Sequence, residues 1–148
     1  MRPLRRLVVV GATLALVAVL VPSVSAASPR SGTLHVTKEC SEFTLLAGGF
    51  CTITSSDLPA IKAGMKVVYA SPVDQVNWTL NSDIVLQGPG NNAAFGHVSL
   101  NLGTGLGVVT FSGGTGRFTG FTAVSVSVSA LGGPDWSWEG PYSFSPAS

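Results

Sequence analysis

Charged side chains are scarce in this sequence, which has 8 Lys and Arg and 7 Asp and Glu among 148 residues. Three of the basic residues, Arg2, Arg5 and Arg6, lie at the extreme N-terminus. Without that segment, five basic residues remain against the seven acidic ones. Nucleic-acid binding needs a dense basic face, and so does docking on anionic membranes. The composition therefore argues against both kinds of partner.

The sequence also lacks an apolar run long enough for a membrane span. Residues 7–21 are apolar apart from Thr13, which is shorter than the roughly 20 residues that a span needs. The basic start and the small residues Val24-Ser25-Ala26 are typical of a Sec-type signal peptide, and a transmembrane anchor is the rival interpretation. We expect a signal peptide at 1–26 cleaved after Ala26, a flexible leader at 27–32, one domain at 33–148, and a secreted product.

Cysteine is limited to Cys40 and Cys51. In an oxidising compartment their spacing fits a disulfide that joins two neighbouring strands, and closing so short a loop contributes roughly 3 kcal/mol. A metal site or a catalytic thiol is the alternative. A metal needs more ligands than two cysteines and two distant histidines readily supply. We therefore predict the disulfide, and no metal or cofactor.

No segment has the pattern of a long amphipathic helix. Short alternating runs, separated by Gly, Pro, Asn and Asp, instead predict strands every 8–12 residues or so. Without helices to cover it, a sheet must pack on another sheet or close on itself, so an antiparallel sandwich or a closed barrel is expected. The predicted strands are 33–38, 50–55, 65–70, 76–80 and 83–87 (or one bent strand), 93–102, 106–111, 121–131 and 136–144.

Strand alternation also predicts which side chains share a face. In 136–144 the aromatic residues fall on one side, and large aromatics dominate the cores of small β domains. We interpret this stripe, and Trp78, as core. In 121–131 the valines are expected to face away from the alanine and serines. The stripe is Trp136, Trp138, Tyr142 and Phe144; the opposed sets are Val124, Val126 and Val128 against Ala123, Ser125, Ser127 and Ser129.

Glycines concentrate between two predicted strands, in Gly114-Thr115-Gly116-Arg117-Phe118-Thr119-Gly120. A dinucleotide-binding loop needs the spacing G-x-G-x-x-G and a following helix. Here the spacing differs and a strand follows, so nucleotide binding is disfavoured. We interpret the glycines as a structural corner that needs positive φ and close backbone approach; its members are Gly113, Gly114, Gly116 and Gly120.

The run Phe111-Ser112-Gly113-Gly114-Thr115-Gly116-Arg117-Phe118-Thr119-Gly120 resembles the F-x-G-G-T-G-x-F-x-G signature of allene oxide cyclase-like and dirigent-like proteins. Trp138-Glu139-Gly140-Pro141-Tyr142 resembles the closing strand of small secreted bacterial members. The resemblance implies a single antiparallel eight-stranded β-barrel with an apolar cavity, often in a homo-oligomer. The plant members are cyclases or direct radical coupling, and their catalytic residues do not map onto positions of this sequence.

Four residues are candidates to line such a lumen and bind a ligand: His97, Glu139, Asp83 and Arg117. His97 and His35 could form an acid–base pair with Glu139, although exposed or hydrogen-bonded structural histidines are commoner. Arg117 either guards a barrel mouth or is exposed at the corner. The sequence has no H-E-x-x-H or G-x-S-x-G motif, so it lacks the marks of zinc proteases and α/β-hydrolases.

Two functions remain open. The first is a secreted barrel that binds a small apolar molecule in its lumen, with an isomerase or cyclase role as an extension. The second is a non-enzymatic extracellular protein that acts through its surface or an oligomer interface. A lumen lined by the four candidates would favour the first. A lumen filled by Trp136, Trp138 and phenylalanines would favour the second.

Overall fold

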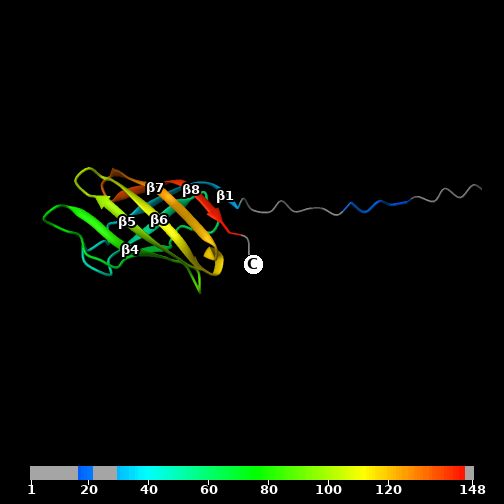
Figure 1. Cartoon of the computed structure of the whole chain (residues 1–148), viewed down its shortest axis with the longest axis horizontal. Helices are drawn as coiled ribbons and strands as arrows, with labels where there is room; N and C mark the ends of the chain where they lie inside the picture. Colours follow the sequence, from blue (N-terminus) through cyan, green and yellow to red (C-terminus); the bar gives the residue numbers. More distant parts are fainter. Residues whose placement is uncertain (1–16, 22–29, 146–148) are drawn as a thin grey trace, which may run out of the picture.

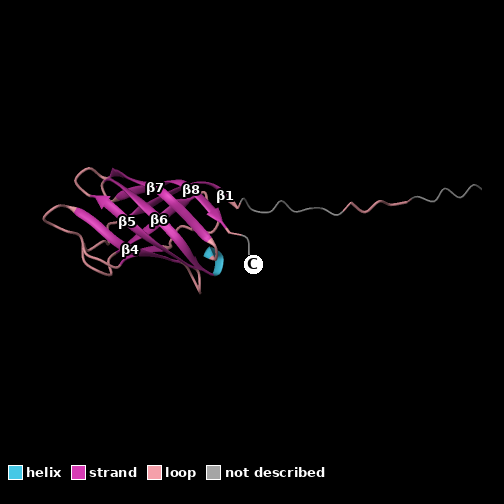
Figure 2. Ribbon diagram, viewed as in Figure 1, coloured by secondary structure: helices cyan, strands magenta, loops and turns pink. Residues whose placement is uncertain are grey.

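The computed structural model describes residues 17–21 and 30–145, and the latter range forms one closed antiparallel barrel (Figures 1 and 2). Each strand pairs with the next, and β8 pairs back onto β1, which confirms the predicted eight-stranded barrel. The strands are β1 Ser31–Glu39, β2 Phe50–Ser56, β3 Lys66–Tyr69, β4 Thr79–Gln87, β5 Ala93–Asn101, β6 Leu106–Thr115, β7 Phe121–Gly132 and β8 Asp135–Phe144, with a 3₁₀ turn η1 at Gly116–Phe118.

The predicted signal peptide lies largely outside the described residues, and 17–21 have no regular secondary structure. Among the described residues, no helix combines the length and apolarity of a membrane span.

The barrel has two distinct ends. The disulfide end carries the loops 40–49, 70–78, 102–105 and 133–134. Here Cys40, just after β1, is bonded to Cys51 in β2, with an S–S distance of 2.07 Å, which confirms the predicted disulfide. The terminal end carries the loops 57–65, 88–92 and 116–120, and the described range 30–145 begins and ends there side by side (Figure 1).

Large side chains fill the barrel interior. Phe111 lies between Phe121 and Trp138, with ring centroids 5.5 Å away in both cases, and Phe118 packs on Phe121 at 5.6 Å. Trp138 is 1% exposed, and the other three aromatic residues of the predicted stripe pack half-buried against the same core. Interdigitated rings of this kind leave little free volume. The stripe therefore belongs to the core, as predicted.

Glycine at position 140 allows β8 to approach β7 closely. A Cβ atom there would lie 2.8 Å from the Cα of Val126, closer than real Cβ contacts. At the corner, Gly116 has φ +58°, and a side chain would collide with Asn92. The corner leads into η1 and then β7 rather than into a long helix. This agrees with the structural interpretation of the glycines.

Strand β7 departs from the predicted alternation. Its pairing with β8 shifts register between Thr122 and Ser127, and Ser125 has φ +60°. Such a β-bulge inserts a residue and changes which side chains face inward. Ala123 and Val126 are consequently both buried, while Val124 is 60% exposed. The prediction that Val124 lies opposite Ala123 is therefore correct, but the predictions that Val124 shares a face with Val126 and that Val126 lies opposite Ala123 are wrong.

Trp78 is also misplaced by the sequence prediction. It lies in the loop before β4, has φ +51°, and is 50% exposed rather than part of the core. The loop residue extends into solvent because its backbone has left the strand geometry that would direct it inward.

Candidate functional site

The four predicted lumen residues all lie outside the barrel. The side chains of Asp83, Glu139 and His97 are 83%, 67% and 50% exposed, and Arg117 is exposed in η1. The predicted lumen position is wrong for each of them. In β5, for example, alternation places Ala94, Val98 and Leu100 inside and His97 outside.

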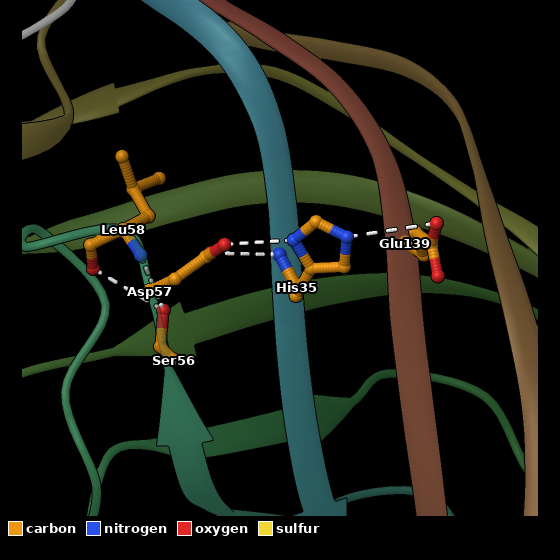
Figure 3. A network of polar contacts seen from close by, with 5 residues as sticks. All are labelled: His35, Ser56, Asp57, Leu58 and Glu139. Carbon is orange, nitrogen blue, oxygen red and sulfur yellow. Dashed lines mark hydrogen bonds and ion pairs between the residues drawn. The ribbon is translucent and has the colours of Figure 1, made fainter.

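The structure brings His35 and Glu139 together with a third residue, Asp57 (Figure 3). His35 in β1 lies directly opposite Glu139 in β8, and Asp57 follows the end of β2. The His35 Nδ1 lies 2.7 Å from Asp57 Oδ2, and its Nε2 lies 3.5 Å from Glu139 Oε1. The His35 backbone N–H also donates to Asp57 Oδ1 at 2.7 Å. This array will be called the His35 network.

Hydrogen bonding sets the charge state of the His35 network. The hydrogen bond to Asp57 raises the pKa of His35, and the nearby Glu139 adds a smaller effect in the same direction. Desolvation is the largest single effect on Asp57 and raises its pKa, but the backbone and side-chain hydrogen bonds from His35 together with its charge outweigh desolvation, so this pKa is lowered overall. Each partner therefore favours the charged form of the other. Sequence reasoning paired His35 with Glu139 but missed Asp57, because it lies in an irregular connection.

The second histidine forms a separate network on the far strands β4 and β5. His97 Nδ1 lies 2.8 Å from Asp83 Oδ1, and its Nε2 lies 2.5 Å from Asn81 Oδ1. The predicted joint action of His97 with His35 and Glu139 is thus not realised. Among the described residues, no group of three His, Cys, Asp or Glu side chains is placed to hold a metal ion.

A shallow groove of about 380 Å³ crosses the outside of β7, β8 and β1 next to the His35 network. Glu139 belongs to both, because it lines the groove and contacts His35. The lining is rich in hydroxyl groups and contains one carboxylate and no basic side chain. It consists of Thr33, Ser125, Ser127, Ser129, Ser137, Glu139, Gly140 and Pro141. The sequence pattern predicted only that Ser125, Ser127 and Ser129 share one face of 121–131.

Inside the barrel lies a charged residue that sequence reasoning missed. Lys38 is 2% exposed, and its Nζ donates to the Tyr69 hydroxyl at 2.5 Å. The Nζ also lies 4.8 Å from the ring centroid of Trp138. Burial lowers the pKa of Lys38 to about 7 and raises that of Tyr69 well above its usual value. Strand alternation could have predicted this burial, since Lys38 follows Leu34 and Val36 at two-residue spacing and therefore lies on the same face of β1.

The molecule thus belongs to the class of closed eight-stranded antiparallel barrels, with a packed interior and a hydroxyl-lined outer groove. Comparisons of the chain with protein-family models, with curated proteins and with solved structures find no match.

Proposed function

We propose that this protein is a secreted barrel that binds a neutral, polyhydroxylated ligand, a carbohydrate, in the groove over β7, β8 and β1. The observation that carries the proposal is the lining of that groove, in which hydroxyl groups surround a single carboxylate. The Cys40–Cys51 disulfide supports the secreted location, because such bonds persist in oxidising compartments.

The chemistry of the lining favours a sugar over other ligands. Serine hydroxyls both donate and accept hydrogen bonds, and an ionised Glu139 accepts them strongly, so together they complement the hydroxyl groups of a sugar ring. The groove has no Lys or Arg in its lining, which disfavours phosphate and other anions. Gly140 and Pro141 add an uncharged part of the lining against which a sugar ring could pack. The volume is at the lower end of the range usual for small-molecule sites.

The packed interior supports a surface role over a ligand in the lumen. Trp138, Phe111, Phe118 and Phe121 occupy the space that an apolar molecule would need. The isomerase or cyclase role that the family resemblance implies also requires an open cavity. The non-enzymatic surface function is therefore the one to which the geometry lends most support.

The test is isothermal titration calorimetry of the disulfide-bonded chain from residue 27 onward with a panel of neutral oligosaccharides. For a sugar that binds, Glu139→Gln and Ser127→Ala should each weaken affinity by about tenfold, the equivalent of one lost hydrogen bond to a charged or polar group. Asp83→Asn and Ser99→Ala are matched controls on the outer face of β4 and β5 and should leave affinity unchanged.

Two outcomes would contradict the proposal. One is the absence of heat change with every sugar of the panel. The other is binding that the groove variants and the β4–β5 controls affect equally. Native mass spectrometry of the same preparation tests the lumen alternative, since an apolar molecule that co-purifies with the folded chain would favour it.

A further inference from the structure

Lys38 is the one residue with a charged side chain that is fully buried among the described residues. Taking an ammonium group out of water costs several kcal/mol unless a counter-charge compensates. The ion pairs of the described residues involve only the two histidines, so no carboxylate compensates Lys38. A methionine or leucine at this position would fill the same space without that cost. The amine itself therefore needs an explanation.

The neighbours of Lys38 are a hydroxyl group and aromatic faces. The Tyr69 hydroxyl is its hydrogen-bond partner, and the rings of Tyr69 and Trp138 lie 5.2 and 4.8 Å from Nζ. The indole Nε1 of Trp138 is buried and has no hydrogen-bond partner in the protein. Lys38 and Trp138 thus supply donors, and only the Tyr69 oxygen accepts. Such a site has unused capacity to bind a carbonyl oxygen.

We propose that Lys38 is a nucleophilic amine that condenses with a small aldehyde to form an imine, with the Tyr69 hydroxyl relaying the protons. This site lies inside the barrel, whereas the groove over β7, β8 and β1 lies on its outside. The proposal for Lys38 therefore does not depend on a ligand in that groove.

The reaction balances without an oxidant or a cofactor. The lone pair of neutral Nζ attacks the carbonyl carbon, a C–N bond forms, and one N–H proton passes through the Tyr69 hydroxyl to the carbonyl oxygen. In the second step Tyr69 protonates the hydroxyl of this carbinolamine, which leaves as water. Tyr69 regains a proton from nitrogen, so the products are the imine and one water molecule.

Burial prepares both groups for these steps. Because desolvation lowers the pKa of Lys38 to about 7, a large share of the amine is neutral near physiological pH. Desolvation raises the pKa of Tyr69, so that hydroxyl keeps its proton and can donate it. An exposed lysine, by contrast, is almost entirely protonated at that pH.

The loop 40–49 covers this site at the disulfide end. Phe43 packs on the Tyr69 ring with centroids 4.9 Å apart, and the Gly48 N–H donates to the Tyr69 carbonyl at 2.8 Å. Leu45 in the same loop has φ +66°, a strained conformation for a leucine. Because side chains fill the interior, the proposed reaction requires an aldehyde of only a few carbons, and Phe43 is the side chain whose displacement would open a path to Nζ.

The experiment traps the imine on the folded, disulfide-bonded protein. The protein is incubated with propanal and cyanoborohydride near neutral pH, and peptide mass mapping measures the rate of propylation at each lysine. Lys62 and Lys66 are exposed and serve as internal references. We expect Lys38 to react about tenfold faster than either reference, because its neutral fraction is larger.

Two variants test the assigned roles. Tyr69→Phe should slow propylation of Lys38 by about tenfold or more, as loss of a proton relay does, and leave Lys62 and Lys66 unchanged. Phe43→Ala should accelerate the propylation of Lys38 by opening the loop. If Phe43 has only a structural role, the rate of Lys38 relative to Lys62 and Lys66 would stay unaltered. Circular dichroism confirms that each variant is folded.

Complete labelling of Lys62 and Lys66 while Lys38 stays unmodified would overturn the proposal. So would a Lys38 rate that rises with mild urea in parallel with the rate of global unfolding, because the amine would then react only in the unfolded chain.

Discussion

The barrel wall separates two basic groups whose pKa values move in opposite directions. Outside, hydrogen bonding to Asp57 raises the pKa of His35. Inside, burial lowers the pKa of Lys38 to about 7. His35 has a carboxylate at each ring nitrogen and is about half exposed, whereas Lys38 is buried and has a neutral hydroxyl group as its hydrogen-bond partner. The position of a residue in the wall thus decides whether pairing or desolvation controls its charge.

The contrast between His35 and Lys38 can be tested most strongly at Lys38, through the pH dependence of the free energy of unfolding. The unfolded lysine binds its proton up to about pH 10.5, and the folded one only up to about 7. Below pH 7 both states are protonated, and the cost of the buried charge is fully present. Between these values only the unfolded state holds the proton, so stability rises with pH, by on the order of 5 kcal/mol in total. Urea unfolding from pH 6 to 10 measures this rise.

The matched control for this prediction is the double variant Lys38→Met, Tyr69→Phe, which removes the amine without leaving the tyrosine hydroxyl unpartnered. It should be more stable than the parent at pH 6 and lack the rise between pH 7 and 10. If the parent's stability is flat over that range, the ammonium is hydrated in the folded state. Above pH 10 the raised pKa of Tyr69 should turn the parent curve downward, because the unfolded tyrosine then ionises first.

A smaller effect on stability is expected at the bulge in β7, where the alternation of inward-facing and outward-facing residues is interrupted. Ser125 has φ +60°, a conformation that glycine adopts without strain. Ser125→Gly should therefore stabilise the barrel by about 1 kcal/mol. Ser127→Gly, two residues on in regular strand geometry, should instead destabilise it by roughly 0.5–1 kcal/mol. Equal destabilisation by both in thermal or urea unfolding would show that the bulge carries no strain.

The smallest expected effect is at the His35 network, where water screens the charges. Asp57→Asn should lower the pKa of His35, as followed by NMR titration of its ring protons, and Asp83→Asn should leave that titration unchanged. Because the folded pKa of His35 is raised, its pairing with ionised Asp57 stabilises the fold at mildly acidic pH and fades as pH rises through that pKa. An unaltered His35 titration in Asp57→Asn would mean that the ion pair does not persist in solution.

The sequence allowed the fold to be predicted better than the site. Alternation, glycine spacing and the two cysteines are local signals, and they located the strands, the corner and the disulfide. The lumen residues were misassigned because alternation gives two faces without saying which is inside. In β5 the clue was a small residue: Gly96 leaves room for the neighbouring ring of Phe111, while Phe95 and His97 share the outer face.

Other features depend on contacts that no local pattern encodes. The change in which residues of β7 face inward follows from the register shift in its pairing with β8, so the position of Val124 relative to Val126 could not be predicted from its own segment. Asp57 joins His35 across 22 positions of sequence. Strand alternation would have placed Lys38 on the buried face of β1, but lysine is so seldom fully buried that this burial was not predicted.

The pairing of the first strand with the last has a consequence for how the chain acquires its structure. Ser31 lies opposite Ser143, and the Phe144 N–H donates to the Arg30 carbonyl at 2.6 Å, so the seam joins residues more than a hundred positions apart. The ribosome must release nearly the whole polypeptide before this seam can form. Contacts so distant in sequence slow folding. The barrel can therefore close only after its last strand, β8, has left the ribosome.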